Sequence, residues 1–96
     1  MISLKIRPLA RSDIKKIWYY SYKNWGKEQA DKYTLDLGKG MENLVSNPEK
    51  GRLIDGIKND YRLLTILEHC VVYRFASTEI DVVRVLGKRM DIKRHL

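Results

Sequence analysis

Apolar and polar side chains alternate strictly at the start of the chain. Residues 2–7 read Ile-Ser-Leu-Lys-Ile-Arg, and in a strand this alternation puts Ile2, Leu4 and Ile6 on one face. Proline follows, and it cannot donate the hydrogen bond that continues a sheet. The pattern therefore predicts a half-buried strand over residues 2–7 that ends at Pro8.

A helical period follows this strand. Between residues 10 and 25 apolar side chains recur mostly at steps of three and four, which predicts an amphipathic helix. We place its start near Arg11 or Ser12, with Asp13 in the first turn, where an acidic side chain suits the helix dipole. Gly26 is expected to end the helix, because glycine readily adopts the left-handed conformation of a C-cap.

The same period returns over residues 27–46 and predicts a second helix. Asn47-Pro48 ends it, because the residue before proline avoids the helical region. Gly38 and Gly40 lie inside this helix, where they either permit close approach to the first helix or are merely tolerated. Since only one or two residues join the two helices, they are expected to form an antiparallel hairpin.

The second half of the chain predicts strands. After a turn-rich loop over residues 49–60, runs rich in Val, Ile and Tyr occupy residues 61–67, 70–76 and 80–87. Short connectors favour an antiparallel meander, and the tail from Lys88 is expected to turn helical near the end. The predicted fold class is α+β in the order β-α-α-β-β-β, with a helical hairpin packed on one face of a small, mostly antiparallel sheet.

The composition favours one small folded domain over residues 1–96. Hydrophobic residues make up 44% and charged residues 32% of the chain, which excludes bulk disorder, and the apolar runs are too short for a membrane span or a signal peptide. A single cysteine excludes an internal disulfide and favours a reducing compartment. With 19 basic and 12 acidic residues the net charge is +7, so the partner is expected to be anionic: nucleic acid, an acidic protein or a membrane surface.

Arginines on the predicted strands suggest a cationic patch. Arg62, Arg74 and Arg84 each lie between apolar neighbours on a different strand. If they share the sheet face away from the helices, they join Lys88 and Arg89 in a patch suited to phosphate or carboxylate groups. The alternative is that each arginine lies separately on a solvated face.

Aromatic residues gather in the first helix. Trp18 and Trp25 are seven residues apart and share a helical face, so we expect both to pack in the core. Tyr19, Tyr20 and Tyr22 point elsewhere. Either they stack on bases or anchor a partner helix, or they are ordinary amphipathic side chains.

The sequence contains no P-loop, dinucleotide-binding turn or metal-ligand spacing. His69 falls in a predicted turn and His95 lies next to the end, so each is expected to be solvated, with a role as general acid or base as the alternative. Cys70 is expected to be a buried structural residue. We predict no catalytic residue, no metal and no cofactor.

Six segments in a fixed order carry a family resemblance. They are Leu9-Ala10-Arg11-Ser12-Asp13-Ile14-Lys15-Lys16-Ile17-Trp18-Tyr19-Tyr20, Trp25-Gly26-x-x-Gln29-Ala30-x-x-Tyr33, Asn47-Pro48-x-x-Gly51-Arg52, Tyr73-Arg74-Phe75, Ile80-x-Val82-Val83-Arg84-Val85-Leu86 and Arg89-Met90-Asp91-x-x-Arg94-His95-Leu96. In order and spacing they resemble the ParE toxins of the ParE/RelE superfamily of bacterial type II toxin–antitoxin modules.

The resemblance implies the fold already predicted, together with a function. A ParE-like protein is a cytoplasmic bacterial toxin that inhibits DNA gyrase by binding, not by catalysis, and so blocks replication. The resemblance also implies a ParD-like antitoxin, whose disordered C-terminal half folds onto the toxin, with DNA contacted only through that complex. The alternatives are the RelE branch, whose members cut mRNA on the ribosome, and an inactive or purely regulatory relative. Only Lys50 and Lys58 supply lysines to the loop that would feed such a site, and the Arg89-Met90-Asp91 ending and the Ile17-Trp18 pair in the first helix favour ParE.

Two candidate surfaces follow. Residues 84–96 contain five basic side chains and one acidic side chain, so this tail is the predicted contact with the target; a tail that only faces solvent is the alternative. The predicted target-binding residues are Arg62, Arg74, Arg84, Lys88, Arg89, Arg94 and His95. The predicted antitoxin-binding residues, along a groove on the helical hairpin, are Trp18, Tyr19, Tyr20, Tyr22, Leu37 and Met41.

Overall fold

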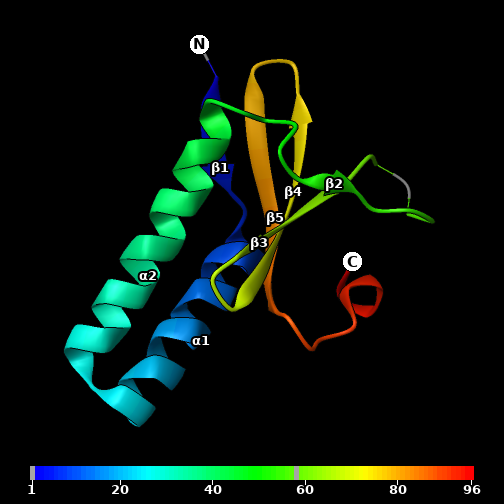
Figure 1. Cartoon of the computed structure of the whole chain (residues 1–96). Helices are drawn as coiled ribbons and strands as arrows, with labels where there is room; N and C mark the ends of the chain where they lie inside the picture. The colour runs from blue at the N-terminus through cyan, green and yellow to red at the C-terminus, as the bar shows by residue number, and fades with distance from the viewer. Residues whose placement is uncertain (1, 58) are drawn as a thin grey trace.

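The computed structural model describes residues 2–57 and 59–96. In chain order the elements are β1 (Ser3–Ile6), α1 (Pro8–Trp25), α2 (Lys27–Glu42), the 3₁₀ turn η1 (Asn43–Val45), β2 (Arg52–Leu53), β3 (Arg62–Ile66), β4 (His69–Ala76), β5 (Glu79–Gly87) and the 3₁₀ turn η2 (Ile92–His95) (Figure 1). Among the described helices, none is long and apolar enough to cross a membrane.

The five strands form one sheet in the order β1-β5-β4-β3-β2. β1 runs parallel to β5, and every other neighbouring pair is antiparallel. Figure 1 shows α1 and α2 side by side as a hairpin on one side of the sheet, with the C-terminal segment on the other side. The predicted α+β class and its helical hairpin are confirmed. β2 lies in the region that the sequence predicts as a loop.

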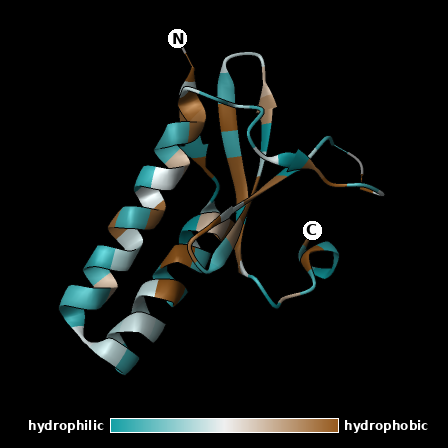
Figure 2. Cartoon of the chain, viewed as in Figure 1, coloured by the Kyte–Doolittle hydropathy of each residue, from teal (hydrophilic) through white to brown (hydrophobic). Residues whose placement is uncertain are grey.

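Two apolar clusters hold the sheet. The larger cluster lies between the sheet and the helices, and the smaller one lies on the opposite face, where Ile92 of η2 packs against it. In Figure 2 hydrophobic residues follow the central strands, whereas the visible side of α2 is mainly hydrophilic. The larger cluster contains Ala10, Leu37, Met41, Leu44, Val71, Tyr73, Ile80, Val82 and Val85, and the smaller one contains Tyr61, Val72 and Val83.

Helix α1 begins earlier than the sequence predicts. Its first residue is Pro8, not a residue near Arg11 or Ser12, because proline at the first helical position has its backbone angle preset and lacks only an N–H that the helix does not use. Asp13 therefore lies beyond the first turn. Gly26, with φ of 92°, ends the helix as predicted.

Two packing predictions are corrected by the structure. Trp25 is not a core residue: it is 64% exposed, because the α1–α2 turn projects beyond the end of the sheet (Figure 1). Gly40 does permit a close approach, but to β3 and not to α1. A Cβ at this position would lie 2.6 Å from Cγ2 of Ile66.

Candidate functional site

An apolar hollow of about 400 Å³ lies between α1, α2 and the β3–β4 turn, and we call it the aromatic hollow. Tyr20 and Trp25 form its outer wall, and both rings are largely exposed. The rings meet edge to face, with centroids 5.9 Å apart, a favourable aromatic arrangement. Its lining residues are Lys16, Ile17, Tyr20, Ser21, Trp25, Gln29, Tyr33, Glu68 and His69.

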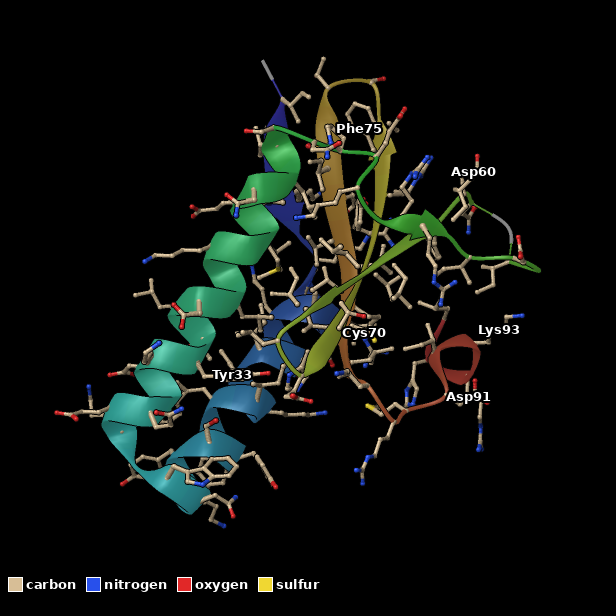
Figure 3. All side chains as sticks on the ribbon, viewed as in Figure 1. Tyr33, Asp60, Cys70, Phe75, Asp91 and Lys93 are labelled. Atoms are coloured by element: carbon tan, nitrogen blue, oxygen red, sulfur yellow. The ribbon has the colours of Figure 1, made fainter. Side chains whose placement is uncertain are left out.

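A hydrogen-bonded pair forms the polar side of the aromatic hollow. The hydroxyl of Tyr33 lies 2.6 Å from Nδ1 of His69 and accepts a 3.0 Å hydrogen bond from the backbone N–H of Glu68. The tautomer of His69 decides which of the two groups donates in this pair. Figure 3 shows Tyr33 projecting from α2 toward the sheet.

Burial changes the titration of both groups of this pair. It lowers the pKa of His69 below its usual value and raises the pKa of Tyr33. Both shifts have the same cause, because burial disfavours the charged form of each group. The expectation that His69 is a solvated turn residue is therefore wrong. No local pattern links position 69 to position 33, since the pair forms only when α2 packs against the β3–β4 turn.

The outer face of α1 carries the other aromatic residues. The rings of Trp18 and Tyr22 stack with centroids 5.2 Å apart, and Nζ of Lys23 lies 4.9 Å from the centre of the Tyr19 ring. Trp18 is half-buried and donates a 2.8 Å hydrogen bond from Nε1 to Asp31. The tyrosines predicted for antitoxin binding thus lie on an exposed, aromatic surface bordered by lysines.

Leu37 and Met41 do not belong to that surface. They are 0% and 3% exposed and lie in the larger core cluster beneath α2. The sequence assigns them correctly to the apolar stripe of α2, but this stripe packs on the sheet. The prediction that they line an antitoxin groove is therefore wrong for this conformation.

The strand arginines do not form one patch. Arg62 lies opposite Tyr73, whose side chain enters the helix-side core, whereas Arg74 lies opposite Asp81 on the other face. Nη1 of Arg62 donates to the backbone oxygens of Glu49 and Gly51. Arg62 therefore holds the loop before β2.

Arg84 is also engaged within the fold. Its Nε and Nη2 donate to the two oxygens of Asp13 at 2.8 and 2.9 Å, and its Nη1 donates to the backbone oxygen of His95 at 3.1 Å. The Asp13 hydrogen bonds raise the pKa of Arg84 above its usual value. Arg84 thus joins α1, β5 and η2. The prediction that it belongs to an exposed cationic surface is wrong.

The remaining predicted target-binding residues lie on the C-terminal segment. Lys88, Arg89, Arg94 and His95 are exposed, as is Lys93 of the same segment (Figure 3). Nζ of Lys88 lies 3.5 Å from a carboxylate oxygen of Glu68. The predicted helical turn is present as η2, so the basic tail is a folded surface.

Comparison with known proteins gives a consistent result. The family model for the ParE toxin of the type II toxin-antitoxin system, parDE, matches residues 4–92. Toxin ParE1 of Mycobacterium tuberculosis (strain CDC 1551 / Oshkosh) is 38% identical over 92 residues, which is 95% of this chain and 94% of the relative. Toxin ParE1 of Caulobacter vibrioides is 32% identical over 87 residues, covering 91% and 90% of the two chains.

Solved structures agree with the sequence comparison. A chain described as the chromosomal ParDE TA system from P. aeruginosa superposes with a TM-score of 0.79 at 26% identity, covering 91% of this chain and 96% of that chain. A copper-bound mutant toxin from Helicobacter pylori, with a TM-score of 0.66 at 15% identity and coverage of 92% and 96%, shares the fold. This chain belongs to the ParE toxin family and is the toxin component of a type II toxin–antitoxin system.

Proposed function

We propose that this toxin arrests bacterial growth in the cytoplasm by binding and inhibiting DNA gyrase, and that a ParD-like antitoxin neutralises it. The observation that carries the proposal is the presence of two exposed surfaces of different chemistry on one small fold. Aromatic side chains border the hairpin, and basic side chains cover the C-terminal segment on the other side of the sheet. One surface suits a neutralising partner and the other suits an anionic target.

The aromatic hollow and the outer face of α1 are the proposed antitoxin surface. Large exposed aromatic side chains such as Tyr20 and Trp25 are the residue types that anchor protein interfaces. Lysines at positions 15, 16 and 23 border this surface, so an amphipathic acidic segment complements it in charge. Binding is coupled to folding of that segment, and the toxin reaches DNA only through the antitoxin complex.

The C-terminal segment is the proposed gyrase contact. Arg89 and Arg94 are exposed guanidinium groups that can each bind a carboxylate or phosphate in a forked geometry. Inhibition by such binding requires no reacting group on the toxin. Loss of a paired guanidinium is expected to cost about 1–3 kcal/mol of binding free energy.

A supercoiling assay with purified gyrase tests the proposal. The toxin is expected to inhibit supercoiling, and added antitoxin is expected to restore it. Deleting Lys93–Leu96, or replacing Arg89 or Arg94 with alanine, is expected to weaken inhibition while leaving antitoxin binding intact. Lys39→Ala is the matched control, because it removes an exposed cation from α2. Unimpaired gyrase together with ribosome-dependent mRNA cleavage would overturn the proposal.

A further inference from the structure

A carboxylate of α1 completes the edge of the sheet. The ladder between β1 and β5 ends where the backbone N–H of Arg7 donates to the oxygen of Val82. Further along β5, the N–H of Val85 faces the same edge and donates to Oδ2 of Asp13 at 3.0 Å. Asp13 is 7% exposed. Its carboxylate accepts the hydrogen bond that a neighbouring strand would otherwise accept at this edge.

The same carboxylate fixes the guanidinium of Arg84. Two nitrogens of Arg84 bind the two oxygens of Asp13, and only Nη1 reaches beyond them, to the backbone oxygen of His95. A forked pair of this kind has a defined orientation, because both groups are planar and two bonds fix them. The direction of Nη1 is therefore set by α1.

The C-terminal segment also contacts the body of the fold through the 3.5 Å ion pair between Lys88 and Glu68. Ile92 packs against the smaller core cluster, while the N–H groups of Arg94 and Leu96 donate to Asp91 and Lys93 within the segment itself. Among the described residues, the bond from Arg84 to His95 is the hydrogen bond that joins the end of η2 to β5.

We propose that Asp13 and Arg84 form a clamp that positions the basic C-terminal segment for its target. Arg84 acts in this proposal as a positioning residue and not as a target contact, and Asp13 orients it. The proposal rests on the proposed function for one point, that the C-terminal segment contacts gyrase. The clamp itself is a statement about the conformational order of residues 92–96.

Arg84→Lys is the decisive variant. A lysine ammonium can pair with Asp13 but lacks the fork that also reaches His95, so the charge stays compensated while the link to η2 is lost. Arg7→Lys is the matched control: Arg7 binds Asp81, which lies on β5 like Arg84, through Nε and Nη2 at 2.8 and 2.7 Å, and this pair includes no residue of η2. Asp13→Asn serves as a second variant that keeps an acceptor for Val85.

Two measurements distinguish the conformational order of the C-terminal segment from the inhibition of gyrase. In Arg84→Lys and Asp13→Asn, amide hydrogen exchange at Arg94 and Leu96 is expected to be faster, and the toxin concentration for half-inhibition of gyrase is expected to rise about tenfold. A rise of that size corresponds to re-ordering about one flexible residue on binding. Antitoxin affinity is expected to stay within about twofold, because the aromatic surface is unchanged. Arg7→Lys is expected to leave exchange at these two amides and gyrase inhibition unchanged.

Each contrary result overturns a different statement. Unchanged exchange at Arg94 and Leu96 in both clamp variants would overturn the clamp. Faster exchange with unchanged gyrase inhibition would overturn its positioning role and leave gyrase as the target. If the unmodified toxin does not inhibit gyrase, the proposed function fails, and hydrogen exchange together with growth arrest by the same variants still decides whether the clamp positions the segment.

Discussion

Replacing Tyr20 with alanine tests whether the antitoxin covers the aromatic hollow. Tyr20 is 61% exposed on α1 and forms part of the outer wall of the hollow. An aromatic side chain presents about 200 Å² of surface, so covering the exposed part removes about 120 Å² from water. At about 25 cal/mol per Å², this burial stabilises the complex by at most about 3 kcal/mol.

We therefore expect Tyr20→Ala to weaken antitoxin binding by about 2–3 kcal/mol, which is about a 30–150-fold increase in Kd. The free toxin is expected to keep its Tm, because the ring is exposed and alanine favours the helix interior. Titration calorimetry with the antitoxin gives the Kd, and thermal unfolding of the free toxin gives the Tm.

Leu35→Ala is the control for this substitution. Leu35 is 59% exposed on α2 but does not line the aromatic hollow, so its removal is expected to leave the Kd nearly unchanged. Equal effects of the two substitutions on the Kd, or an unchanged Kd for Tyr20→Ala, would refute the assignment of the hollow to the antitoxin.

Three further predictions concern the fold around the site. Tyr73→Phe should destabilise the toxin by about 1–3 kcal/mol in urea unfolding, because the buried hydroxyl donates to Pro48 at 2.7 Å and accepts from Gly51 at 2.9 Å; an unchanged midpoint would contradict this. Gly51→Ala should lower the Tm, since its Cβ would lie 2.8 Å from the Tyr73 ring and 3.0 Å from a backbone oxygen. Burial lowers the pKa of His69 in the folded state, so the unfolded chain binds a proton at a higher pH than the folded chain does. The free energy of unfolding should therefore fall as the pH drops below about 6.5. His69→Gln should reduce this fall, as measured by urea unfolding at a series of pH values.

The elements of the fold were predictable because their signals are local. Alternation over residues 2–7 and the helical period after it each depend on side chains a few positions apart, and those periods fix which face is buried. β2 carries no such signal. It consists of Arg52 and Leu53 alone, and it exists through its pairing with β3.

The exposed aromatic surface was only partly predictable. Spacing places Trp18 and Trp25 on one helical face, but it does not say where the sheet beneath that face ends. Because the hairpin projects beyond the strands (Figure 1), Trp25 lies in the open hollow and not in the core. The tyrosines beside it were recognised because one stripe cannot bury so many aromatic side chains.

The faces of the strand arginines depend on register, which the sequence leaves undetermined. The pairing of β4 with β5 shifts between Val72 and Tyr73, and such an irregularity changes which side chains share a face. Arg62 and Arg74 lie on opposite faces because the register of β3 with β4 pairs Arg62 with Tyr73, the chain neighbour of Arg74. Lys88 and Arg89, the members of the predicted cationic patch on the C-terminal segment, are exposed.

The contact between Asp13 and Arg84 joins residues 71 positions apart, and its origin lies in the end of β1. Pro8 stops the ladder after the Arg7–Val82 hydrogen bond and begins α1 at the same point. A longer β1 would satisfy the Val85 N–H with its own backbone and leave Asp13 as a surface acid. Because the strand ends early, the edge requires an acceptor from α1, and the carboxylate that supplies it also fixes Arg84. The orientation of the basic segment thus follows from where the first strand stops.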